Sequence, residues 1–262
     1  MPLEAPAGET VSADVAIKIG ERKLQAKFTV PAGPTRLIEL LPLAQNLANA
    51  IVNAAEEDVV EQGESISCKK GCGACCRQLV PISQVEARRI RDLVEEMPEP
   101  RRSEIKNRFA QARQRLKDSG VLDKLENRER WAPDGVEKIG MEYFGLGIPC
   151  PFLEEESCSI HPDRPITCRE YLATSPAEFC AQPTRETVRT ARIPLKVWTA
   201  VARFDKVVTG ERFIRWVPLI LAPEWADSHP DPTPPRPGPE LLKELFEHLT
   251  GKDVPAPPVG LG

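Results

Sequence analysis

The sequence lacks the features that mark several large classes of protein. No apolar run approaches the roughly 18 residues of a membrane-spanning helix, and the N-terminus has no basic region followed by an apolar one. With 35 Lys and Arg against 39 Asp and Glu, the formal net charge is −4, whereas dedicated nucleic-acid binders are usually basic. We therefore expect no secretory signal, no membrane insertion, no nucleic-acid partner and a cytoplasmic location.

Sequence motifs of common enzymes are also missing. There is no glycine-rich phosphate loop, no His-Glu-x-x-His helix and no Gly-x-Ser-x-Gly turn. The composition is otherwise that of a globular protein, with 41% hydrophobic and 28% charged residues. Proline is abundant, at 27 of 262 residues against a usual share of roughly 5%, and this favours irregular segments.

Hydrophobic periodicity predicts a mainly α-helical fold with a small N-terminal β-hairpin and irregular cysteine-rich loops that a metal stabilises. Apolar and polar residues alternate over 13–30 on both sides of Gly20-Glu21-Arg22, which is typical of a hairpin. Helical spacing then predicts a helix within 35–62 that Pro42 starts or kinks and Gly63 ends. Further helices are predicted over 83–97, with a Ser83–Glu86 capping box, and over 103–117, 196–208 and 240–250, and a strand is predicted near 212–221.

These elements suggest a chain of four parts. They are a hairpin segment (1–33), an amphipathic helix (34–63), a cysteine-cluster metal-binding domain (64–221), and a proline-rich linker with a short amphipathic helix and a tail (222–262). The last helix is expected to dock on its own chain rather than on a partner. Residues 131–183 are predicted to be irregular, with Glu154–Glu156 forming a solvated acidic loop.

Eight cysteines in two groups are the strongest functional signal. At about 3% of the chain they are too dilute for a disulfide scaffold, which typically exceeds ~8%, and disulfides do not persist in a reducing compartment. Clustered cysteines in such a chain indicate metal binding or catalysis. The first group is Cys68, Cys72, Cys75 and Cys76, and the second is Cys150, Cys158, Cys168 and Cys180.

The spacing of the first group suits a soft metal centre, because thiolates three or four residues apart can converge on one side of a turn. Cys75 and Cys76 are adjacent, so their side chains are expected to diverge, and one of them would serve a second metal atom or a bridged cluster. Radical-SAM enzymes use the same spacing. Here, however, Ala74 replaces the usual aromatic residue before the third cysteine, and no alternating strand–helix series follows.

The second group lies in a proline-stiffened loop, whose conformational entropy is costly unless a metal fixes it. Seven thiolates exceed the four of one zinc site or one [4Fe–4S] cluster, so two centres or one polynuclear centre fit best. His161 is an open candidate for an eighth ligand, while Cys180 is interpreted as a buried free thiol. The predicted metal ligands are Cys68, Cys72, Cys75, Cys76, Cys150, Cys158 and Cys168.

Basic residues flank both groups. A four-thiolate centre with Zn²⁺ or [4Fe–4S]²⁺ carries about −2 net charge, which nearby cations can offset while donating hydrogen bonds to sulfur. The candidates are Lys69, Lys70, Arg77, Arg164 and Arg169.

These motifs resemble the YkgJ-type cysteine-cluster family, described as a zinc- or iron-chelating domain. The resemblance covers residues 68–171 and leaves out the hairpin, the long helix and the C-terminal part. It implies metal binding. Part of the flagellin lysine N-methylases is similar, but we find no SAM-binding strand–turn here. The matching residues are the first cysteine group, then Cys150-Pro151-Phe152-Leu153, Cys158, Ile160, Arg164-Pro165, Cys168-Arg169 and Tyr171.

Three functional hypotheses follow. The first is a metal-binding protein with a structural or electron-carrying centre and a protein partner. The second is a SAM-dependent or redox enzyme that modifies protein side chains, and the third is a metal chaperone or sensor with an exposed, labile site. We favour the first because so many thiolates suit a closed site. Cysteine-only ligation suits both metals, and the surplus thiolates favour an iron–sulfur cluster over zinc.

Overall fold

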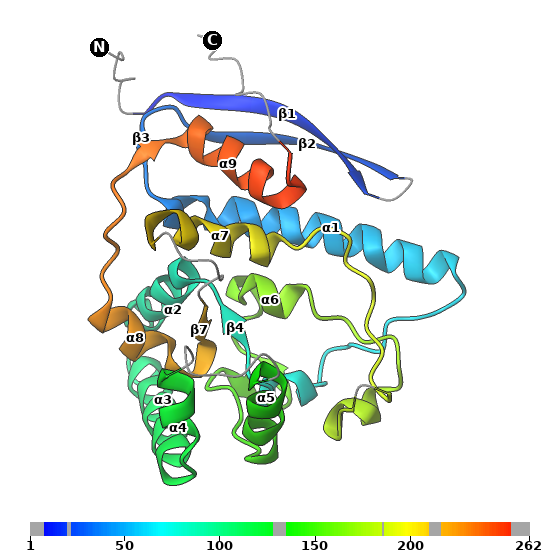
Figure 1. Ribbon diagram of the computed structural model, residues 1–262, viewed down its shortest axis with the longest axis vertical. Coiled ribbons are helices and arrows are strands. Elements are labelled where there is room, and N and C mark those ends of the chain that lie inside the picture. The colour runs from blue at the N-terminus through cyan, green and yellow to red at the C-terminus, as the bar shows by residue number, and fades with distance from the viewer. Residues whose placement is uncertain (1–7, 20–21, 128–134, 185, 210–215, 253–262) are drawn as a thin grey trace.

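An antiparallel hairpin covers one end of the molecule (Figure 1). The computed structural model describes residues 8–19, 22–127, 135–184, 186–209 and 216–252. Strands β1 (Thr10–Ile19) and β2 (Arg22–Pro31) pair along their whole length, as the alternating pattern predicts. The predicted turn at Gly20-Glu21 lies outside the described residues. One face of the hairpin, which includes Phe28 and Val30, is buried against the helices below it.

Three helices pack beneath this hairpin and complete the first core. They are α1 (Leu41–Glu61), α7 (Val197–Thr209) and α9 (Gly238–Thr250), and they confirm three of the predicted helices. Phe246 of α9 meets Phe28 of the hairpin edge-on, with ring centroids 5.2 Å apart. The C-terminal helix therefore docks on its own chain, as expected.

The ends of the helices follow the capping residues. A proline lies in the first turn of α1, and Gly63, just past its end, adopts φ +75°. The capping box is present at the start of α2 (Gln84–Glu96): the N–H of Glu86 points at the Ser83 hydroxyl, and the Glu86 carboxylate accepts from the Ser83 N–H at 2.9 Å. The predicted end of α1 before Gly63 and the predicted start of α2 after Ser83 are therefore confirmed.

Helices also build the opposite part of the molecule. After α2 the chain forms α3 (Arg101–Asp118), α4 (Val121–Glu126) and α5 (Gly135–Gly145), so two further predicted helices are confirmed. The prediction that 131–183 is irregular is wrong for α5. Three glycines weaken its helical signal, but Ile139 and Tyr143 are buried in the core shared with α3 and α4, so packing outweighs local propensity.

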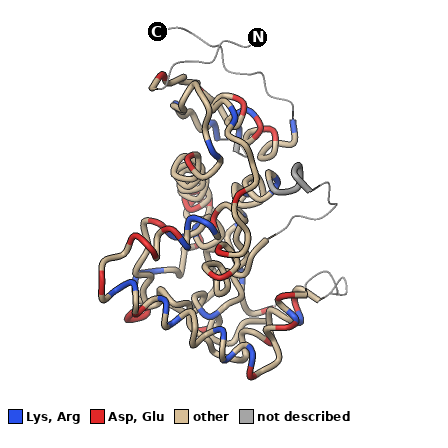
Figure 2. The backbone as a smooth tube through the Cα atoms, turned by 90° about the vertical axis from the view of Figure 1, so that its left-hand side faces the viewer, with Lys and Arg blue, Asp and Glu red and all other residues tan. Residues whose placement is uncertain are grey.

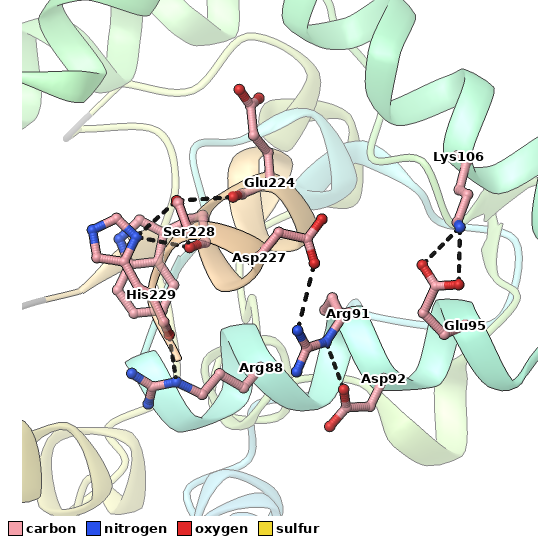
Figure 3. Close-up of polar contacts among 10 residues, drawn as sticks. Arg88, Arg91, Asp92, Glu95, Lys106, Glu224, Asp227, Ser228 and His229 are labelled. Carbon is pink, nitrogen blue, oxygen red and sulfur yellow. Dashed lines mark hydrogen bonds and ion pairs between the residues drawn. The ribbon is translucent and has the colours of Figure 1, made fainter. Parts of the chain in front are cut away.

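The proline-rich stretch after residue 221 begins with a helix, α8 (Ala222–Ser228), rather than with open linker. Proline is tolerated here because it lies in the first turn. Figure 3 shows how α8 is held on α2: Arg91 pairs with Asp227, and Nε of Arg88 donates to the carbonyl of His229 at 3.0 Å.

Short elements connect these layers. Antiparallel pairs form between β3 and β8 and between β4 and β7. The strand predicted near 212–221 lies partly outside the described residues, and its remainder forms β7 and a 3₁₀ turn. The bounds are β3 (Pro34–Thr35), η1 (Leu37–Leu40), β4 (Pro81–Ile82), β7 (Val217–Pro218), η6 (Leu219–Leu221) and β8 (Arg236–Pro237).

Acidic and basic residues are interspersed along the backbone (Figure 2). Many of them pair locally, for example Lys106 with Glu95 between α3 and α2 (Figure 3). In the part of the chain that the structure describes, no helix combines the length and apolar character needed to cross a membrane. The charge pattern is that of a mixed, solvated surface.

A buried carboxylate links the two halves of the protein. Glu86 is 2% exposed and accepts from the N–H of Ile166 at 2.7 Å, at the start of the one-turn helix α6 (Ile166–Arg169). It also accepts from the N–H and hydroxyl of Ser83 at 2.9 and 2.7 Å. Burial raises the pKa of Glu86, while these hydrogen bonds oppose the rise. Glu86 thus fixes α6, which bears Cys168, against α2.

We expect Glu86→Ala to lower the free energy of unfolding by about 3 kcal/mol, because two buried N–H groups lose their acceptor. Glu86→Gln keeps one amide oxygen as an acceptor and should lose less than half of that. Urea unfolding of the three proteins measures both effects. Equal stabilities would show that Glu86 does not hold α6 in place.

Candidate metal centre

The first cysteine motif lies on the loop between α1 and β4. Cys68 and Cys72 occupy irregular chain, and Cys75 and Cys76 lie in the 3₁₀ turn η2 (Ala74–Arg77). This confirms the predicted loop that leads into a turn of helix. The loop has few internal hydrogen bonds, so its shape depends on the segments packed against it.

The second motif is built around a tight hairpin of β5 (Leu153–Glu154) and β6 (Ser157–Cys158). The two turn residues, Glu155 and Glu156, have φ values of +47° and +54°. Two positive φ values in a two-residue turn give the type I′ twist that matches antiparallel strands. The hairpin places Cys158 on β6, with Cys150 just before β5.

This hairpin packs directly on the first motif. A Cβ atom added to Gly73 would lie 2.5 Å from Oε2 of Glu156 and 2.7 Å from Cδ1 of Leu153. Arg77, at the end of η2, pairs with the same Glu156 through two hydrogen bonds of 2.9 and 2.7 Å. We call this contact the Gly73–Glu156 contact; it fixes how the two motifs lie relative to each other.

The acidic run is exposed at Glu155 and Glu156, as predicted, but Glu154 and Glu156 also form ion pairs that the sequence does not predict. Glu154 receives hydrogen bonds from Arg101 and, at 2.6 Å, from Arg108, both on α3. The hydrogen bond from Arg101 lowers the pKa of Glu154, and the hydrogen bond from Arg77 lowers that of Glu156. The run anchors the hairpin at both ends.

Backbone hydrogen bonds join the segments that bear the cysteines. The N–H of Cys150 donates to the carbonyl of Cys76 at 2.7 Å. The N–H of Ala173 donates to Sγ of Cys68 at 3.2 Å, and the N–H of Ser67 donates to the carbonyl of Ala173 at 2.8 Å. The first motif is thus tied to the chain on both sides of Cys168.

Helix α6 presents the last cysteine of the predicted set. Cys168 lies on this one-turn helix, between the α2 contact made by Glu86 and a second buried carboxylate, Glu170. Glu170 accepts from the N–H of Val197 at 2.6 Å at the start of α7. Burial raises the pKa of Glu170 to about 7. Two helices therefore hold α6 in position.

Cys75 interacts electrostatically with cysteines of both motifs. All eight cysteines are free thiols. Burial raises the pKa of four thiols outside the η2 turn, and charge on Cys75 adds to the rise at each of them, which shows that Cys75 lies within electrostatic reach of both motifs. These four are Cys68, Cys150, Cys158 and Cys168.

The adjacent cysteines lie together in the 3₁₀ turn η2. The neighbouring Cys76 and burial raise the pKa of Cys75, so the two thiols influence each other. The expected divergence of their side chains stays a prediction.

The cysteines do not form a ready metal site. Among the described residues, no three Cys, His, Asp or Glu side chains form a group that could hold a metal ion as they stand. The chemistry of the donors nevertheless fits Zn²⁺ or an iron–sulfur cluster, since both are bound by cysteine thiolates.

Cys180 is a buried free thiol, as the sequence analysis predicts, but the fold brings it close to the first motif. It lies on the 3₁₀ turn η5 (Ala177–Ala181), which packs against η2, and its side chain is buried. Burial raises its pKa, and the charges of Cys68, Cys72 and Cys75 add to the rise. The spacing of Cys180 in the sequence does not predict that it lies near the first motif, because only the tertiary fold brings η5 against η2.

The flanking cations fall into different roles. Arg77 serves the Gly73–Glu156 contact, and Arg169 donates to the side chain of Asn49 at 3.0 Å and to backbone carbonyls. Lys69 and Lys70 are exposed. Of the five predicted cations, Arg164 has the broadest effect: it opposes the burial-induced rise of pKa at Cys68, Cys75 and Cys158.

The two remaining candidates lie at the edge of the region. His161 is exposed on the 3₁₀ turn η4 (His161–Asp163), and burial together with Arg164 lowers its pKa. The hydroxyl of Tyr171 accepts from Nε2 of Gln78 at 3.3 Å. Burial raises the pKa of Tyr171, and the charges of Cys180 and other cysteines add to the rise, so this side chain adjoins the first motif.

Residues 67–187 match the model of the CxxCxxCC family, described as a "Putative zinc- or iron-chelating domain". Within this match, which we call the CxxCxxCC segment, the first motif has three residues between Cys68 and Cys72 and two between Cys72 and Cys75. The match spans both motifs and Cys180, and it supports a metal-binding role with zinc or iron. No curated protein and no solved structure matches the chain. The CxxCxxCC segment thus rests on helices and a hairpin that the family model does not cover.

We expect Gly73→Ala to disturb the Gly73–Glu156 contact and to cost about 1 kcal/mol of stability, because the new methyl group displaces the ends of the Glu156 and Leu153 side chains. Metal content should fall with it. Gly140→Ala is the matched control, since a Cβ there meets no atom within 4 Å in helix α5. It should be neutral or stabilising by up to about 1 kcal/mol. Equal behaviour of the two variants in thermal unfolding would contradict the contact.

Proposed function

We propose that the CxxCxxCC segment holds a thiolate metal centre that joins its two cysteine motifs, with a structural or electron-carrying role. The observation that supports this best is the placement of Cys75 within electrostatic reach of cysteines from both motifs. Two of these cysteines, Cys150 and Cys158, also pack against the apolar core that Ile90 and Phe152 share. A metal would exploit the arrangement by binding the cysteines as thiolates.

The proposed ligands are the seven predicted cysteines together with Cys180. Cys180 is included because it is buried, its turn packs against η2, and the charges of Cys68, Cys72 and Cys75 raise its pKa. Eight thiolates are the number that two four-thiolate centres need, and they also suit one polynuclear centre. Coordination would release the protons of the thiols, whose pKa values burial raises, to solvent.

We favour iron–sulfur over zinc for this centre. The cysteines of the two motifs exceed the four thiolates that one tetrahedral ion binds, which suits a cluster with several metal atoms better. A [4Fe–4S] cluster would supply one-electron transfer, and an electron carrier needs a redox partner, which we expect to be a protein. Zinc would supply structural stability only. In either case free thiols fit a reducing, cytoplasmic setting.

The enzyme and the chaperone hypotheses make different demands. A chaperone or sensor needs an exposed, labile site, whereas in this segment only Cys68 is exposed and Cys180 is buried. A modifying enzyme needs a substrate pocket with titratable groups beside the cysteines, and Tyr171 is the described group that comes nearest to this role. We therefore rank the enzyme hypothesis and the chaperone hypothesis below a closed metal centre.

Anaerobic purification followed by analysis for Fe, Zn and acid-labile sulfide tests the proposal. Cys72→Ser and Cys168→Ser, one from each motif, should both lose metal and fall in unfolding temperature, because metal-binding energy is also folding energy. Cys180→Ser should lose metal as well. If Cys180→Ser kept the full metal content of the wild type, the proposed ligands would again be only the seven predicted cysteines. A folded wild-type protein without metal would contradict the proposed function.

A further inference from the structure

Ala173 lies in a buried stretch of chain between two other segments. It forms an isolated antiparallel bridge with Thr190, and the residues on either side of this pair make the two hydrogen bonds of the bridge, at 3.0 and 2.8 Å. In a bridge of this kind, the N–H and carbonyl groups of the two central residues point away from each other. Ala173 is 1% exposed, so its own N–H and carbonyl need partners elsewhere in the protein.

The first cysteine motif supplies both partners. The carbonyl of Ala173 accepts from the N–H of Ser67 at 2.8 Å, and the N–H of Ala173 donates to Sγ of Cys68 at 3.2 Å. The hydroxyl of Ser67 also donates to the carbonyl of Ser175, a residue that is 1% exposed. The start of the motif therefore lies along the bridge as a third segment, and a sulfur atom stands where a regular sheet would have a carbonyl oxygen.

This hydrogen bond holds the sulfur of a residue that is otherwise exposed. The structure describes all eight cysteines, and of these Cys68 alone is exposed. A neutral thiol is a weak acceptor, so the bond contributes little to the metal-free fold. A metal-bound thiolate is a charged acceptor, and hydrogen bonds to charged acceptors are roughly twice as strong. The bond from Ala173 thus gains strength when Cys68 becomes a ligand.

We propose that the backbone N–H of Ala173 positions the sulfur of Cys68 as a ligand of the thiolate centre and stabilises the negative charge of that thiolate. This inference rests on the proposed metal centre. Ala173 acts through Cys68, so it is a positioning residue and not a ligand. In an iron–sulfur cluster, a hydrogen bond to a ligand sulfur favours the more negative, reduced form, and the bond from Ala173 would therefore raise the reduction potential.

Ala173→Pro removes this N–H, because proline has no backbone donor. The metal affinity, measured in competition with a chelator, should fall by about tenfold, since groups that hydrogen-bond metal ligands typically contribute that much. If the centre is an iron–sulfur cluster, its reduction potential should also become more negative. A merely structural role of Ala173 does not predict this shift.

Thr190→Pro is the matched control, because it places the same ring at the facing position of the bridge. Within the described part of the chain, the N–H of Thr190 donates no hydrogen bond, so proline removes none there. The affinity and the potential of this variant should equal those of wild type. An equal loss in both proline variants, or an unchanged affinity and potential in Ala173→Pro, would overturn the role of the Ala173 N–H.

Should Ala173→Pro fail to fold, cadmium NMR of the wild-type protein still decides the matter. Cadmium is a soft ion that thiolates bind, and the nuclear spin of its magnetic isotope couples through a ligand sulfur to an amide proton hydrogen-bonded to that sulfur. The amide proton of Ala173 should show this coupling. Cadmium bound by the cysteines without coupling to this proton would overturn the role of Ala173 alone. A wild-type protein that binds neither iron, zinc nor cadmium would instead overturn the proposed centre, and this inference with it.

Discussion

The Gly73–Glu156 contact determines how two distant stretches of chain meet. A glycine without a side chain accepts the turn of the second hairpin, and Arg77 holds that turn through a bidentate ion pair. Beside this contact, the N–H of Cys150 donates to the carbonyl of Cys76. The two motifs thus meet through a side-chain ion pair and a backbone hydrogen bond.

The longer helices position this contact but contribute none of the proposed ligands. Only the one-turn helix α6 bears one, Cys168. Arg101 and Arg108 of α3 hold one end of the second hairpin through Glu154. Buried Glu86 of α2 holds α6 and hence Cys168. The cost of ordering irregular loops is offset partly by these anchors, and a metal would offset the rest. The N- and C-terminal elements that the family match does not cover supply most of the larger apolar core.

Local patterns predicted the elements whose signals are local. The hairpin alternation, the Ser83–Glu86 capping box and the apolar face of α9 were all readable from neighbouring residues. Helix α5 was missed because glycines obscure its period and tertiary packing compensates. The ion pairs of Glu154 and Glu156 and the return of Cys180 to the first motif depend on contacts distant in sequence. No spacing rule encodes them.

X-ray absorption at the metal edge of the purified protein tests the central claim most directly, because it reports the atoms bound to the metal. The account predicts a first shell of sulfur alone, at about 2.3 Å. An iron–sulfur cluster would add a metal–metal distance that a mononuclear zinc site lacks. A first shell dominated by nitrogen or oxygen would show that the cysteines of the two motifs do not form the centre.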